Sequence, residues 1–92
     1  MPVFVVESYL PNAPAAVADA RERAERAAEP EGGVRYVRTT FLPDDELVLH
    51  VFEASSDDAV RRAAARVALT YERISPAVEG GLSNEPRTKE TT

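Results

Sequence analysis

The stretch VRYVRTTFLPDDELVLHVF, residues 34–52, decides the fold. Its two halves, 34–41 and 47–52, are rich in β-branched and aromatic residues, which favour strands. The segment PDD at 43–45 separates them and consists of residues that are common in turns. Because a connection this short can join two neighbouring strands only if the chain reverses direction, the stretch predicts an antiparallel β-hairpin.

The register of this hairpin depends on whether its loop holds two, three or four residues, and the sequence leaves that choice open. One register places Leu42 opposite Leu47. The further pairs in that register are Thr39–His50 and Val37–Phe52. A shift by one residue turns every side chain to the other face of a sheet, so the face that carries His50 follows from the register.

Four further elements flank the hairpin. Residues 2–9 are β-branched and aromatic and predict a first strand. Over 12–28, alanines recur at intervals of three and four residues, which predicts an amphipathic helix. The segment SSDD at 55–58 predicts the start of a second helix, because it offers a capping hydroxyl followed by acids. Residues 72–79 predict a weaker last strand, and Pro76 indicates an edge position or a bulge.

The order β-α-β-β-α-β predicts a ferredoxin-like α+β fold, with a four-stranded antiparallel sheet in residues 1–79. Right-handed crossover connections place both helices on one face of the sheet. Apolar residues occupy both faces of the strands, so a monomer would expose a large apolar surface. We therefore expect a homodimer in which two sheets form a sandwich or barrel. Residues 80–92 lack apolar periodicity and are expected to form a polar, flexible tail.

Composition excludes several classes of partner and site. The net charge of −5 argues against nucleic acid or an anionic membrane as the main partner. The chain has no cysteine, so it has no disulfide and no thiolate metal ligand. The first ten residues lack the basic segment and the long apolar run of a signal peptide, and we expect a cytoplasmic protein.

His50 is the single histidine and the first candidate for chemistry. An imidazole can bind a transition metal or act as an acid or base near neutral pH, although a lone histidine on a strand is also common as a packing residue. A metal site can be built from His50 with Glu7 or Glu53. Alternatively, a two-fold axis can bring two copies of His50 together.

Tyr36 and Arg38 are candidates for binding a small ligand. They are two residues apart in a predicted strand and so are expected on one face, where they can line the cleft between two sheets. The alternative is that they pair with Glu7 or Glu53 at the surface of the sheet or at the dimer rim.

Four segments also carry a resemblance to a known family: MPVFVVE at 1–7, GVRYV at 33–37, EASSDDAVRRAA at 53–64 and ERI at 72–74. The chain resembles a family of small bacterial ferredoxin-like proteins of unknown function that includes nickel-binding members from actinobacteria. The resemblance implies a dimeric fold with a cleft between sheets, and nickel as the metal. Relatives that bind metal carry several histidines, and many have a cysteine where this chain has His50.

Three functions remain open. The first is a small dimeric binding protein for nickel or another divalent metal. The second is a dimeric α+β-barrel enzyme or accessory protein that holds a small hydrophobic metabolite in the intersheet cleft. The third is a structural dimer without a ligand. No nucleophile-elbow or phosphate-loop motif occurs in the sequence, which favours a protein that is not an enzyme.

Overall fold

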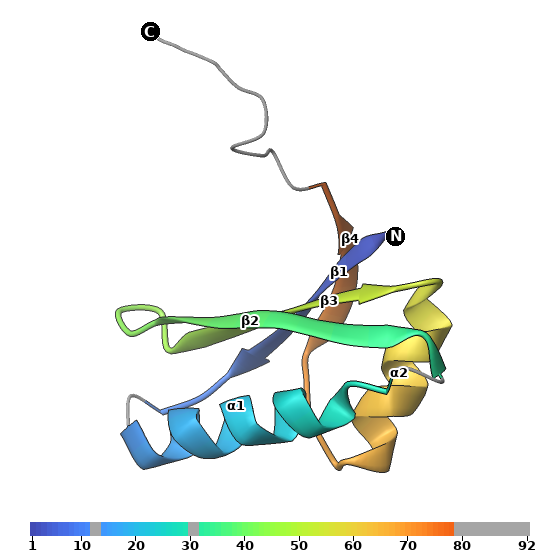
Figure 1. Ribbon diagram of the computed structural model, residues 1–92. Helices are drawn as coiled ribbons and strands as arrows, with labels where there is room; N and C mark the ends of the chain where they lie inside the picture. Colours follow the sequence, from blue (N-terminus) through green and yellow to red (C-terminus); the bar gives the residue numbers. More distant parts are fainter. Residues whose placement is uncertain (12–13, 30–31, 79–92) are drawn as a thin grey trace, which may run out of the picture.

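The computed structural model describes residues 1–11, 14–29 and 32–78, and its elements follow the predicted order (Figure 1). They are β1 (Val3–Tyr9), α1 (Pro14–Ala27), β2 (Val34–Leu42), β3 (Leu47–Ala54), α2 (Asp57–Arg66) and β4 (Arg73–Ala77). Within these ranges, no helix is long and apolar enough to cross a membrane. The predicted tail, 80–92, lies outside the described residues.

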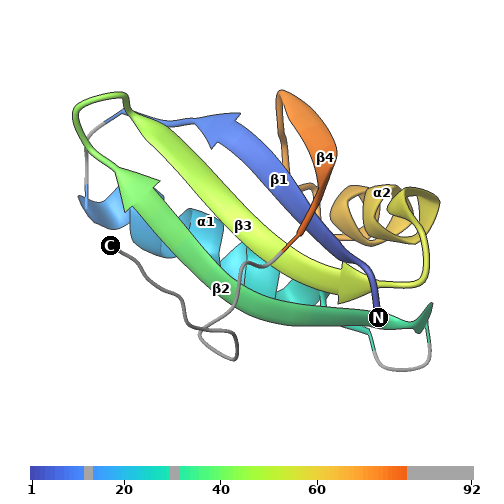
Figure 2. The same cartoon turned by 90° about the horizontal axis from the view of Figure 1, so that it is seen from above.

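The four strands form one antiparallel sheet in the order β2-β3-β1-β4. Both helices lie against the same face, as the right-handed crossovers require (Figures 1 and 2). The ferredoxin-like fold is therefore confirmed. We call the other side of the sheet the open face, because neither α1 nor α2 covers it. β4 is an edge strand, which confirms the position inferred from Pro76.

The hairpin adopts the register that places Leu42 opposite Leu47 and Thr39 opposite His50. These two predicted pairs are confirmed, and they place Thr39 and His50 on the same face of the sheet. The positions of the apolar strand residues explain the choice, since this register buries Val48, His50 and Phe52 beneath the helices.

A β-bulge interrupts β2 at Val37. The register shifts between Tyr36 and Arg38, so Tyr36 lies opposite Phe52 and Arg38 lies opposite Val51. The predicted Val37–Phe52 pair is wrong, because Val37 is an extra residue that the partner strand does not match. The bulge lets Tyr36 and Thr39 both face the helices, although they are three residues apart.

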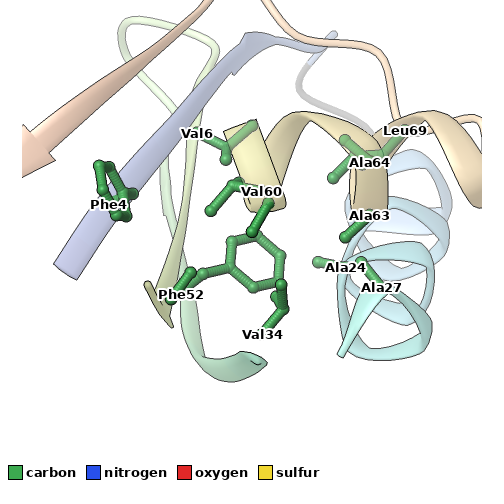
Figure 3. Packing of buried hydrophobic residues seen from close by; sticks show 12 residues of the cluster. Phe4, Val6, Ala24, Ala27, Val34, Phe52, Val60, Ala63, Ala64 and Leu69 are labelled. Carbon is green, nitrogen blue, oxygen red and sulfur yellow. The ribbon is translucent and has the colours of Figure 1, made fainter. Parts of the chain in front are cut away.

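The core lies between the sheet and the two helices (Figure 3). Phe52 is its largest fully buried side chain, and Figure 3 shows the ring beside Val60 and Val34. The helices contribute mostly alanines, which allow them to approach the sheet closely. The buried helical residues of the cluster are Ala24, Ala27, Ala59, Val60, Ala63 and Ala64.

Both ends of α2 are determined by local residues. Ser56 is the N-cap, and its Oγ accepts a hydrogen bond from the backbone N–H of Ala59 at 3.2 Å, which confirms the predicted start. At the other end, Ala68 has a left-handed φ of 57°, and the N–H of Leu69 donates to the carbonyl oxygen of Ala64 at 2.9 Å. This is a Schellman ending in which an alanine occupies the position that glycine usually takes.

Candidate functional site

His50 lies on the helix-facing side of β3, in the middle of the molecule. It pairs with Val6 of β1 and with Thr39 of β2, and its side chain has no exposed surface. Burial lowers the pKa of His50 from 6.5 to about 4 by desolvation of the charged form. The imidazole is therefore neutral at pH 7.

A hydrogen-bonded series of three side chains, which we call the His50 network, holds this ring in place. The Tyr36 hydroxyl lies 2.7 Å from Oγ1 of Thr39, and Oγ1 lies 2.8 Å from Nδ1 of His50. The Tyr36 ring also packs edge-on against Phe52, with ring centroids 5.8 Å apart. The orientation of the imidazole is thus set by its Nδ1 side.

Nε2 of His50 has no hydrogen-bond partner among the residues that the structure describes. A buried polar atom without a partner costs about 1–3 kcal/mol. The other side of the same ring is fully bonded, so this cost is confined to one atom. Nε2 is therefore the atom through which the site can gain a new partner.

His50 borders a cavity of about 310 Å³ between α1, the end of β1 and the loop that follows α2. We call it the His50 cavity. Its lining residues are Ser8, Leu10, Ala16, Asp19, Ala20, Arg23, His50, Ala68, Leu69 and Thr70. The four α1 residues recur at helical spacing and so lie on one side of the helix. The volume is at the lower end of the range of about 300–1,000 Å³ that is usual for ligand pockets.

Ser8 and His50 are the two buried polar residues within the described part of the chain, and both line this cavity. Ser8 is fixed by a hydrogen bond from its Oγ to the backbone carbonyl oxygen of Thr70, at 2.7 Å. At the rim, Nε of Arg23 lies 3.2 Å from a carboxylate oxygen of Asp19, and Nη1 of Arg23 donates to the carbonyl oxygen of Val67 at 3.1 Å. The cavity thus combines a polar floor with a charged rim.

The carboxylates that we considered as metal ligands do not accompany His50. Glu7 pairs with Leu49 and Glu53 pairs with Val3, positions whose side chains point to the open face. Each is bonded to an arginine there: Glu7 to Arg73 at 3.4 Å and Glu53 to Arg35 at 3.0 Å. Glu7 and Glu53 are therefore separated from the His50 ring by the sheet.

Tyr36 and Arg38, which we expected on one face, lie on opposite faces. This prediction is wrong because the bulge at Val37 adds a residue between them. Tyr36 packs against the core and joins the His50 network. Arg38 is on the open face and its side chain is exposed. The two residues cannot line one ligand site in a single chain.

The donors of the described residues do not fit a nickel centre within one chain. No group of three or more histidine, aspartate or glutamate side chains in the described ranges could hold a metal ion. Nε2 of His50 is one imidazole donor, and the carboxylate that shares its cavity, Asp19, already pairs with Arg23. A single neutral nitrogen is too few ligands for a transition metal. Because His50 has no exposed surface beneath α1, a copy on the open face would not bring two His50 rings together.

Among the polar residues that hold this site together, sequence reasoning gave no role to Ser8, to Arg23, or to Thr39 as a partner of His50. Thr39 had a signal, since the correct register already placed it opposite His50. Ser8 and Arg23 had no signal in the sequence, because their contacts join segments that are far apart along the chain. The Ser8–Thr70 hydrogen bond spans 62 residues and the Arg23–Val67 hydrogen bond spans 44.

Four antiparallel strands with two helices on one face, in the order β-α-β-β-α-β, define a ferredoxin-like α+β protein. Residues 4–76 match the family described as "Nickel responsive protein SCO4226-like", and the chain belongs to this family. The family resemblance found in the sequence is thus confirmed.

Among solved structures, the chain is similar to the crystal structure of SCO4226 from Streptomyces coelicolor A3(2). The TM-score is 0.69 at 17% sequence identity, over 86% of this chain and 99% of that chain. At this identity the likeness establishes a shared fold. A comparison with curated proteins gives no match.

Proposed function

We propose that this protein binds a small organic molecule in the His50 cavity. The observation that carries the proposal is Nε2 of His50, a buried nitrogen with no partner among the described residues, on a side chain that borders a cavity of about 310 Å³. A ligand that bonds to Nε2 offsets the cost of leaving this atom unpaired. Leu10, Leu69 and the alanines of α1 supply apolar surface for the rest of the ligand.

Binding fits the electrostatics of the site better than proton transfer does. An efficient general base has a pKa near the working pH, and burial holds the pKa of His50 at about 4. The network through Thr39 fixes the orientation of the ring. Because His50 has no exposed surface, a ligand must shift the side chains above Nε2 before it can bond there.

The cavity can be tested by filling it. Ala16 is half-buried and lines the cavity, whereas Ala15 is its exposed neighbour on α1 and lines no part of it. We expect Ala16→Leu to remove binding of small organic fragments, as followed by amide chemical shifts of Ser8 and Leu69, and Ala15→Leu to leave binding unchanged. If fragments bind Ala16→Leu as they bind the parent, the ligand site is elsewhere.

Nickel binding is the second candidate, and family membership supports it. It requires donors beyond those that the described residues bring together. Calorimetric titration of chelator-stripped protein with nickel, zinc and cobalt separates the two candidates. Saturable nickel binding that is lost in His50→Gln would make His50 a metal ligand and would overturn the organic-ligand proposal. Nickel binding that survives in His50→Gln would assign the metal to another part of the chain.

We also propose that a second copy of the chain covers the open face. Half-buried Val3, Val5, Leu47 and Leu49 form an apolar strip there, and Tyr9 at its edge is 63% exposed. The ion pairs Arg35–Glu53 and Glu7–Arg73 flank the strip. An apolar centre with a polar rim is the usual anatomy of a protein interface. The His50 cavity lies on the other side of the sheet, so both copies keep it accessible.

A further inference from the structure

The His50 cavity also indicates which chemical class of ligand it takes, an inference that rests on the function proposed above. The question is whether the groups that line the cavity offer protons or lone pairs. Ser8 and His50 each already form one hydrogen bond to a protein group. Those bonds determine what remains for a ligand.

Ser8 offers lone pairs. Its single hydroxyl proton is used in the hydrogen bond to the carbonyl oxygen of Thr70, at 2.7 Å. A serine hydroxyl has one donor and two acceptor lone pairs, so after this bond only acceptor capacity is left. The carbonyl oxygen of Thr70 and the carboxylate of Asp19 add further acceptors around the cavity.

His50 offers a lone pair by a similar argument. In a neutral imidazole, one nitrogen carries the proton and the other accepts. If Nε2 carried the proton, a buried N–H would have no partner among the described residues, and orphaned N–H groups are rarer than orphaned acceptors. If Nδ1 carries it, Nδ1–H donates to Oγ1 of Thr39, and Thr39 donates in turn to the Tyr36 oxygen. Tyr36 is partly exposed, so water can accept its proton.

Arg23 and Thr70 bear the side-chain donors among the other lining residues, and two nitrogens of Arg23 are occupied by Asp19 and by the carbonyl oxygen of Val67. Ser8 Oγ and His50 Nε2 therefore both keep acceptor capacity, and both residues belong to the lining of the cavity. We infer that the ligand is a small uncharged molecule with an O–H or N–H donor, such as an alcohol, a phenol or an N–H heterocycle, and that this donor bonds to Nε2 of His50.

The first experiment determines the tautomer of His50 directly. Long-range nitrogen–proton correlation spectra of the imidazole at pH 7 distinguish a protonated Nδ1 from a protonated Nε2. We expect the Nδ1–H form in the parent. In Tyr36→Phe the Thr39 hydroxyl loses its acceptor, and we expect the Nε2–H form to increase. A parent protein in the Nε2–H form would overturn the inference, whether or not any ligand binds.

The second experiment compares three probes of similar size that differ in their polar group. Pyrrole has an N–H donor, furan is its isostere without a donor, and cyclopentanone has only an acceptor. In NMR titrations, we expect pyrrole to bind about five- to tenfold tighter than furan or cyclopentanone, the ratio that one neutral hydrogen bond supplies. In His50→Phe, which keeps an aromatic ring and removes Nε2, this preference should disappear.

The outcomes separate this inference from the proposed function. If all three probes bind in the cavity with equal affinity, or cyclopentanone binds most tightly, the donor inference is wrong and the binding site stands. If none of the probes perturbs Ser8 or Leu69, the proposed function fails, and the tautomer of His50 still decides whether Nε2 is an acceptor. Folding of His50→Phe is checked by its amide spectrum. Tyr36→Phe provides a milder variant in which the His50 imidazole is retained.

Discussion

Arg66 in α2 donates a hydrogen bond from Nη2 to the backbone carbonyl oxygen of Arg26 in the last turn of α1, at 3.0 Å. The same nitrogen lies 3.3 Å from the carbonyl oxygen of Ala27. In the reverse direction, Arg23 of α1 donates to the carbonyl oxygen of Val67 at the end of α2. The two helices thus cap each other's C-terminal ends with cationic side chains, where the helix dipole favours positive charge.

We expect Arg66→Ala to lower the free energy of unfolding by about 1–2 kcal/mol, because two terminal carbonyl groups of α1 lose a charged donor. Arg62 is the matched control, since its ion pair with Asp58 stays within α2 and both side chains are exposed. Removal of Arg62 should change stability by less than about 0.5 kcal/mol. Urea unfolding of the two variants measures the difference, and equal effects would show that the cross-helix bond contributes nothing.

Ala68 offers a substitution that should stabilise the protein. Its φ of 57° is costly for alanine and free of strain for glycine. We expect Ala68→Gly to raise the free energy of unfolding by about 1 kcal/mol. The same change at Ala65, an exposed residue within α2, should lower it by about 1 kcal/mol. Thermal unfolding of both variants tests this contrast in sign, and destabilisation by Ala68→Gly would refute it.

The stability of the protein should depend on pH through His50. Its pKa is about 4 in the folded state and 6.5 in the unfolded chain, so the unfolded state binds more protons between these values. The contribution of a neutral His50 to the free energy of unfolding is fully present above about pH 6.5. It is lost as the pH falls toward 4, and the total loss is about 3 kcal/mol.

A variant without the imidazole isolates the contribution of the histidine. We expect the loss of stability between pH 7 and pH 4.5 to be smaller in His50→Gln, whose side chain does not titrate. Urea unfolding at a series of pH values gives both curves. Parallel curves for the parent and the variant would mean that His50 is not held neutral by burial.

The second copy proposed for the open face makes a prediction about oligomeric state. We expect a dimer at micromolar concentration and a monomer in Leu49→Lys, because Leu49 belongs to the apolar strip and a lysine there would be desolvated in the interface. Ala65→Lys on the exposed surface of α2 should leave the mass unchanged. Sedimentation equilibrium distinguishes these cases, and a parent protein that sediments as a monomer would rule out the dimer.

Most of the fold could be predicted from periodicity and turn residues. The pattern of residues 34–52 gave the hairpin, and SSDD at 55–58 gave the start of α2 at the correct cap. The bulge at Val37 could not be predicted, because valine is an ordinary strand residue and an extra residue leaves no mark in a strand pattern. That one residue explains both the wrong Val37–Phe52 pair and the wrong placement of Arg38 beside Tyr36.

The candidate site was predicted only at its centre. His50 stood out by residue type, since the chain contains a single histidine. The cavity around His50 could not be predicted from the sequence. Ala16 and Ala20 are typical of close packing and do not indicate that space remains beside them. Ser8 and Thr70 meet only after β1 and the loop following α2 are brought together by the fold.

The bulge at Val37 has an evolutionary consequence. Insertions are usually tolerated in loops, whereas this extra residue lies inside a strand and determines which face the following side chains occupy. A relative whose β2 is one residue shorter at this point would turn either Tyr36 or Thr39 away from the helices. Such a relative would lack the His50 network even if it kept the histidine, so a histidine at this position does not by itself indicate the site.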